Sequence, residues 1–253
     1  MKETSIESTT CERRPGWPAF RERGVSNNDS ENPMTRTLPT PAAAPTPATD
    51  LSLDLAALVG PAGWARLPAA VRRRFGRGHG SATYAGRLAL RCSLAGRVFA
   101  ALARAFGSPL SGTTDEVPAA VRVFDDGRGG MVWERHFHTV DAGAPHVVRS
   151  VKQQGAGGLE ERTDGGLGMD LRVFEDGGAL VFESRAFFLA LGRLRLRVPA
   201  LLSPGTCRVV HTDLGAGLFR FDLDMVHPLW GHTFHQSGVF ADPVLAIHEG
   251  SAQ

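Results

Sequence analysis

Residues 217–240 read GLFRFDLDMVHPLWGHTFHQSGVF, and this stretch decides the fold. Its first half alternates, with Phe219, Phe221, Leu223 and Met225 on one side and Arg220, Asp222 and Asp224 on the other. A period of two is typical of a β-strand that turns one face to a core and the other to water. The stretch therefore predicts two strands, over 217–226 and 231–240, joined by a short connection.

The same pattern continues upstream through most of the chain. Short alternating runs are separated by Asp-Gly and Gly-Gly turns, which are strong hairpin signals. We expect further strands near 83–91, 119–125, 130–138, 146–153, 167–175, 179–189, 193–198 and 206–213. In 193–198 the side chains expected to face inward are Leu194, Leu196 and Val198. Consecutive strands with short connections favour an antiparallel meander that forms a barrel or a strongly curved sheet.

Two short helices are predicted near the N-terminal end of this region, so the fold class is mainly β with α+β character. The first carries apolar residues at a spacing of four, Leu67, Val71 and Phe75. The second spans 94–106 after the N-cap residue Ser93, and its apolar stripe should face the core. That stripe consists of Leu94, Val98, Leu102 and Phe106. The expected architecture is the intracellular lipid-binding type of barrel, whose helices cover the open end; a helix-grip fold is the alternative.

The chain divides by composition. Residues 1–60 are expected to be a disordered leader, because this polar, Pro/Ala/Thr-rich stretch cannot bury enough apolar surface to offset its ordering entropy. Met34 offers a second start, so 1–33 are expected to be an upstream extension. A single β-rich domain over 61–242 and a tail over 243–253 complete the organisation.

Composition excludes several classes of function. The formal net charge of +2 is small and the basic residues are spread over many segments, which argues against a nucleic-acid partner. The cysteines, Cys11, Cys92 and Cys207, form no CxxC pair, as in a reducing cytoplasm. No apolar run is long enough for a transmembrane segment, and no signal peptide is evident. Neither a dinucleotide fingerprint nor a phosphate-binding loop is found, so no cofactor is predicted.

A weak candidate metal site lies on the strand near 130–138. His136 and His138 are two residues apart on one face, Glu134 precedes them, and His146 opens the next strand. Imidazoles and a carboxylate at this spacing can reach one zinc or iron ion. The alternative is a solvated polar face, because these residues oppose Trp133.

Other polar residues are expected on the apolar side of strands. Arg135 lies between Trp133 and Phe137, and Glu183 and Arg185 lie between Val181 and Phe187. Buried charges need partners, so these residues form either an internal Arg–Glu pair or a pocket that binds a carboxylate or phosphate head group. His232 and Gln236 share the expected inner face of the last strand. The candidate ligand-binding residues are therefore Trp133, Arg135, Glu183, Arg185, His232 and Gln236.

A hydrolase triad is not supported. Ser184, His211 and Asp213 occur, but no GxSxG nucleophile elbow accompanies them. His211 and Asp213 are expected on an exposed surface.

Several aromatic-rich segments are distinctive: WERHF at 133–137, LVFESRAFFLALGRLRLRVP at 180–199 and RFDLDMVHPLWGHTFHQSGVF at 220–240. Together with LPAAVRRRFG and GRVFAALARAFGSPL upstream, they resemble the bacterial family called domain of unknown function 4166. Members stand alone or are fused behind saccharopine-dehydrogenase-like reductases, which implies small-molecule or lipid metabolism and a reductase partner. The resemblance carries over no catalytic residue. The family has a Tyr in the closing strand where this chain has Phe234 or His235.

The leading functional hypothesis is a non-enzymatic barrel that binds an apolar or amphipathic small molecule. A second hypothesis is an isomerase, cyclase or hydrolase in which Arg135, Glu183 and His232 converge in the same cavity. A third is an accessory domain that binds a reductase through an exposed apolar patch.

Overall fold

The computed structural model describes residues 53–77, 81–104, 113–137, 146–155 and 157–243, which all belong to one compact unit, Ala48–Gln253. The expected leader up to residue 52 and the tail beyond 243 lie outside these residues. So does Phe106.

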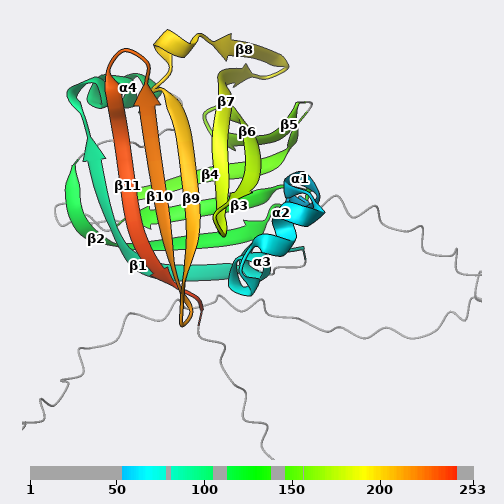
Figure 1. Ribbon diagram of the computed structural model, residues 1–253. Helices are drawn as coiled ribbons and strands as arrows, with labels where there is room; N and C mark the ends of the chain where they lie inside the picture. Colours follow the sequence, from blue (N-terminus) through cyan, green and yellow to red (C-terminus); the bar gives the residue numbers. More distant parts are fainter. Residues whose placement is uncertain (1–52, 78–80, 105–112, 138–145, 156, 244–253) are drawn as a thin grey trace, which may run out of the picture. The chain divides into compact units, whose positions relative to one another are not determined.

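The described chain is dominated by antiparallel strands (Figure 1). In chain order these are β1 (Ala82–Cys92), β2 (Thr114–Asp125), β3 (Met131–Phe137), β4 (His146–Gly155), β5 (Gly158–Thr163), β6 (Leu167–Asp176), β7 (Ala179–Leu191), β8 (Leu194–Val198), β9 (Thr206–Gly215), β10 (Leu218–His227) and β11 (Gly231–Ala241). Sequence analysis missed β5. The other strands correspond to expected ones.

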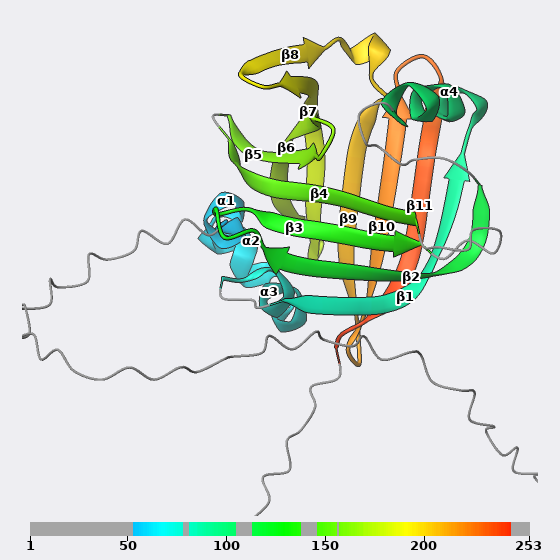
Figure 2. The ribbon, with the colours of Figure 1, turned by 180° about the vertical axis from the view of Figure 1, so that it is seen from behind.

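The sheet closes on itself. Its strand order is β6-β5-β4-β3-β2-β1-β11-β10-β9-β7-β8, and an additional β6–β7 pairing joins the two ends. Every strand except β8 therefore belongs to a closed antiparallel barrel (Figure 2). The predicted barrel of mainly β class is confirmed.

Strand β7 has a divided role in this closure. Leu180–Glu183 pair with β9, whereas Phe187–Leu191 pair with β8 instead. β6 pairs with β7 along almost its whole length. The wall is thus continuous at one end, while at the other end β8 separates from β9 (Figure 2).

Four α-helices accompany the barrel in the described chain: α1 (Leu55–Val59), α2 (Pro61–Arg66), α3 (Ala69–Phe75) and α4 (Leu94–Ala103). A short 3₁₀ helix, η2, spans Ala200–Leu202. Helices α1 to α3 pack apolar side chains against the inner faces of β5, β6 and β7, using Leu53, Leu55, Leu67, Val71 and Phe75. Residues 53–60, which were assigned to the leader, therefore belong to the folded unit. None of the described helices is long and apolar enough to span a membrane.

Helix α4 packs differently from the prediction. Its buried residues are Gly96, Phe99 and Ala100, while the predicted stripe residues Leu94, Val98 and Leu102 are exposed. The reason is the close approach at Gly96, where a Cβ atom would lie 2.1 Å from the carbonyl oxygen of Thr233. Contact through the smallest residue turns the glycine face, rather than the stripe, toward the barrel.

The predicted strand faces are confirmed in β10, where Phe219, Leu223 and Met225 are buried. In β8 they are wrong for Leu194 and Leu196, which are exposed, whereas Val198 lines the interior as predicted. The reason is that β8 pairs only with β7 and projects from the barrel, so alternation along it does not mark a core-facing side.

A buried ion pair ties α3 to the barrel. The Arg74 guanidinium donates to Asp242 at 2.6 and 2.8 Å and to Asp213 at 2.9 Å. It also lies 4.6 Å from the centre of the Phe219 ring. The hydrogen bonds from Arg74 lower the pKa of Asp242 despite its partial burial. Asp213, expected on an exposed surface, is instead a partner of this buried arginine.

Replacing Arg74 with Met should lower the free energy of unfolding by about 3 kcal/mol, because it leaves two carboxylates without their cation. Urea denaturation near neutral pH measures the loss. Arg73→Met is the control, since Arg73 is 62% exposed and lies 3.5 Å from the same Asp242. Its loss should stay below about 1 kcal/mol. Similar losses for the two variants would contradict the role given to Arg74.

Candidate ligand cavity

The barrel encloses a cavity of about 260 Å³. Its walls are mainly apolar and come from β3 to β11 and α4; among them are Phe137, Val148, Met169, Phe187, Leu223 and Phe234. Leu102 of α4 and Leu202 of η2 line the cavity and are also 64% and 68% exposed. These two residues therefore mark its mouth, at the end where β8 leaves β9.

A polar cluster lies on the wall formed by β3, β4 and β5. Glu161 accepts a hydrogen bond from Ser150 at 2.6 Å and lies 2.9 Å from the Lys152 ammonium. The Arg135 guanidinium donates to Ser150 at 3.2 Å and to Glu161 at 3.4 Å. All four side chains also line the cavity, together with Gln236.

Two aromatic rings, those of Trp133 and Phe182, lie between the cluster and α3. The Lys152 ammonium lies 4.4 Å from the centre of the Trp133 ring and 5.4 Å from that of Phe182. Phe75 of α3 stacks against the other side of this layer, 5.8 Å from Trp133. The polar cluster is therefore the floor of the cavity, opposite the mouth.

Burial and charge act against each other in the cluster. Burial would raise the pKa of Glu161, but the charges of Lys152 and Arg135 and the Ser150 hydrogen bond lower it to about 2. Burial lowers the pKa of Lys152, and Glu161 opposes this shift. Glu161 is thus ionised at neutral pH. The permanent charge of Arg135 balances that of Glu161, and protonation of Lys152 would add one positive charge to the floor.

Of the predicted ligand-binding residues, the structure brings Arg135 and Gln236 to the cavity wall. Trp133 lies directly beneath Lys152 rather than on the wall of the main cavity. The internal Arg–Glu pair exists, but Glu161 is the partner and not Glu183.

Glu183 and Arg185 lie outside the cavity, contrary to the expectation from alternation. In the β6–β7 ladder Asp170 pairs with Ala186 and Leu171 with Ser184, so Arg185 occupies a bulge. A bulge shifts the alternation by one residue, and Arg185 becomes exposed.

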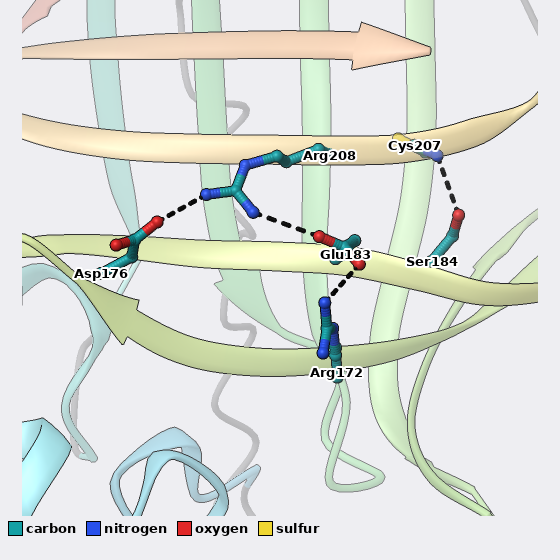
Figure 3. Close-up of polar contacts among 6 residues, drawn as sticks. All are labelled: Arg172, Asp176, Glu183, Ser184, Cys207 and Arg208. Carbon is teal, nitrogen blue, oxygen red and sulfur yellow. Dashed lines mark hydrogen bonds and ion pairs between the residues drawn. The ribbon is translucent and has the colours of Figure 1, made fainter. Parts of the chain in front are cut away.

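Figure 3 shows Glu183 between two arginines of neighbouring strands. Its carboxylate accepts from Arg172 of β6 at 2.6 Å and from Arg208 of β9 at 3.1 Å. Arg208 also contacts Asp176 at 2.7 Å. Glu183 therefore belongs to a chain of ion pairs across the strands and not to the cavity.

His232 is likewise displaced by a bulge. Met225 pairs with Phe234 and Val226 with His232, so Thr233 is the extra residue. The His232 side chain is 73% exposed, 3.7 Å from Asp224. Arg135, Glu183 and His232 do not converge, which contradicts the arrangement expected for an enzyme built on these three residues.

The weak metal candidates do not assemble. His136 Nε2 lies 2.8 Å from Glu134, but within the described residues no three His, Cys, Asp or Glu side chains are grouped as metal ligands. His138 and the side chain of His146 lie outside the described part of the chain.

A second chamber of about 40 Å³ adjoins the first and shares Arg135, Phe137, Phe221 and Gln236 with it. It is lined by Trp133 and His211, whose Nε1 and Nε2 atoms are buried and have no hydrogen-bond partner among the described residues. A chamber of this size accommodates ordered water, which would satisfy both atoms.

His211 is buried, so its expected surface position was wrong. Its ring lies 4.7 Å from Phe75 and 4.4 Å from Phe219. Burial and the charge of Arg74 lower the pKa of His211 to about 3, so the ring is neutral at ordinary pH.

Sequence analysis missed three residues of the floor, Ser150, Lys152 and Glu161. The signal for the first two was present, since they follow Val148 at a spacing of two in a predicted strand. Glu161 belongs to β5 and shares a face with Leu159. Because Glu160, Glu161 and Arg162 are all charged, the segment shows no alternation of apolar and polar residues. Cys207 is also buried, and burial raises its pKa to about 12, so its thiol is not a reactive nucleophile.

The model of the family described as "Domain of unknown function (DUF4166)" matches residues 67–240. The chain belongs to this family. The DUF4166 match begins at Leu67, so it includes α3, the whole barrel wall and every residue of the floor, while α1 and α2 precede it. No curated protein and no solved structure matches the chain.

Replacing Glu161 with Gln should lower the free energy of unfolding by about 3 kcal/mol near neutral pH, because two buried cations lose their counter-charge. The pKa of Glu161 falls from its ordinary 4.5 to about 2, so its ionised form stabilises the fold above pH 4.5 and this contribution is lost as the pH falls toward 2. The stability difference between wild type and Glu161→Gln should shrink over that window, as measured by urea denaturation.

Glu116→Gln is the control, because Glu116 is 74% exposed in its pair with Arg87. It should change stability by less than about 1 kcal/mol at any pH. A pH-independent effect of Glu161→Gln would refute the electrostatic account of the floor.

Proposed function

We propose that this protein binds an amphipathic small molecule, an alkyl or similar apolar chain with an anionic head group, in the cavity of its barrel. The observation that carries the proposal is a hollow, mainly apolar interior whose floor sets the Arg135 guanidinium and the Lys152 amine around one carboxylate, Glu161. Small-molecule sites combine an apolar cavity with a few converging polar groups in this way.

The apolar walls favour a chain-like ligand. A cavity of about 260 Å³ is close to the lower end of small-molecule pockets, which hold roughly 300–1,000 Å³. Each methylene group removed from water contributes about 0.8 kcal/mol. Affinity should therefore rise by roughly fourfold for each added methylene until the cavity is full.

The floor favours an anion. The guanidinium of Arg135 uses one donor toward Ser150 and one toward Glu161, and a planar guanidinium has five donors. With Lys152 protonated, a carboxylate bound there would balance the positive charge that the floor then carries. A neutral head group would leave that charge uncompensated.

Narrowing the cavity should block binding. Val198 of β8 is half-buried on the cavity wall, so Val198→Trp should weaken binding of anilinonaphthalene sulfonate by roughly tenfold or more in a fluorescence titration. Val239→Trp is the control, because Val239 is 40% exposed on β11 and does not line the cavity. If wild-type protein shows no saturable uptake, or both variants bind alike, the proposed function is wrong.

The head-group assignment has its own test. Arg135→Gln should weaken binding of dodecanoate by roughly 10- to 100-fold, because a hydrogen bond to a charged group contributes about 1.5–3 kcal/mol. Binding of dodecanol, which has the same chain and no charge, should change little. Isothermal titration calorimetry measures both ligands.

The matched variant is Arg122→Gln on the exposed side of the neighbouring strand β2, which should leave both affinities unchanged. Equal losses for the acid and the alcohol would show that Arg135 shapes the cavity without recognising charge.

A further inference from the structure

Exposed apolar side chains gather around the mouth of the cavity. They come from α4, η2 and the β10–β11 turn, and we call them the rim: Leu94, Val98, Leu102, Leu201, Leu202, Leu229 and Trp230. Their exposed fractions run from 55% for Leu201 and Trp230 to 77% for Leu94. Apolar residues this exposed and this close together mark an interaction surface.

The three elements of the rim are packed together around His227. Trp230 stacks on the His227 ring at 4.4 Å, and Phe99 of α4 lies 5.6 Å from the same ring. The His227 Nε2 atom lies 3.4 Å from the carbonyl oxygen of Leu201 in η2. The rim is therefore a single preformed surface, whose parts are held by one buried side chain.

The β7–β8 hairpin extends this surface at the same end of the barrel. Figures 1 and 2 both show β8 and α4 at the end opposite the β9–β10 turn. Leu191, Leu194 and Leu196 of the hairpin are 45–55% exposed. Helical spacing predicted that the stripe of α4 faces a core, and alternation predicted the same for the leucines of β8. Both sets face outward at this end of the barrel instead.

The charge on these elements has one sign. Residues 93–104, 185–204 and 226–232 contain no Asp or Glu. Exposed arginines accompany the rim instead, among them Arg97 and Arg104 of α4 and Arg193 and Arg197 of the β7–β8 hairpin. At this end Arg195 of the hairpin is paired with Glu160 of β5 and Asp170 of β6, and Asp224 lies 2.8 Å from the ring of His235.

We infer that the rim docks on a lipid bilayer with anionic head groups. Leucine and tryptophan side chains beside arginines, without carboxylates, match an interface of acyl chains beneath phosphates. A protein partner would normally be met by both signs of charge at the edge of the surface, whereas the rim and hairpin segments carry arginines and no Asp or Glu, and the carboxylates described beside them are already paired. Docked in this way, the mouth between Leu102 and Leu202 would open directly onto the bilayer.

The experiment is vesicle flotation with the full-length chain. Wild-type protein should float with vesicles of phosphatidylcholine and phosphatidylglycerol, and much less with phosphatidylcholine alone. The triple variant Leu94→Gln, Leu201→Gln, Leu229→Gln should bind at least tenfold more weakly. None of these three residues lines the cavity.

A matched triple variant, Val147→Gln, Leu214→Gln, Leu218→Gln, removes apolar residues that are 41–47% exposed elsewhere on the barrel. It should float as wild type does. Replacing Arg97, Arg104 and Arg193 with Gln should reduce binding to anionic vesicles by roughly 100-fold, because each arginine near a charged bilayer contributes about fivefold. Circular dichroism and thermal melting verify that each variant is folded.

Three outcomes would overturn the inference. The first is wild-type protein that does not bind anionic vesicles, and the second is a rim variant that binds them as wild type does. The third is a wild-type dimer in light scattering that the rim substitutions dissociate, with no vesicle binding, which would assign the rim to a second copy of the chain. Ligand uptake, measured separately without vesicles, shows whether the proposed cavity function fails or stands in each case.

Discussion

The divided pairing of β7 is the constraint on which the rest of the structure depends. Its first half holds β9 and its second half holds β8, while β6 follows it along almost the whole length. The barrel is thereby closed at one end and parted at the other. Without that parting the inner apolar faces would be sealed, and α4 and η2 would have no opening to border. The pairing of β7 thus determines both the closed barrel and the mouth of its cavity.

The two ends of the barrel are stabilised by different physics. At the closed end, α3 inserts Phe75 among aromatic rings and buries Arg74 against Asp213 and Asp242. Near the middle, the floor sets Arg135 and Lys152 against a single carboxylate, Glu161. A buried charge is costly unless it is paired, so these three side chains depend on one another. The mouth is surrounded by exposed apolar side chains, although protein surfaces in water are mostly polar. The polar floor and the apolar rim therefore lie at opposite ends of one cavity.

Two local bulges explain why residues on correctly predicted strands were assigned to the wrong side of the barrel wall. Arg185 in β7 has no partner in the ladder with β6, and Thr233 in β11 has none in the ladder with β10. Beyond each of these bulges, the residues that face the interior change from odd to even numbers or the reverse. Glu183 and His232 were therefore assigned to the interior although both face outward. A bulge depends on pairing with a strand distant in sequence, so its position is not visible in the alternation of one strand. Arg135 pairs with Glu161 and not with Glu183. Glu161 lies on β5, a strand that was not predicted from the sequence.

The amino-acid sequence by itself determined the β class, the antiparallel order with short turns, and the burial of Arg135 and Gln236 in the barrel, because turn chemistry and a period of two act locally. Tertiary structure alone decided the closure between β6 and β7, the grouping of Ser150, Lys152 and Glu161 with Arg135, and the outward stripe of α4. These features depend on which segments meet across long sequence separations. The stripe of α4 is the clearest case, since its pattern predicts an apolar face but the contact at Gly96 decides where that face points.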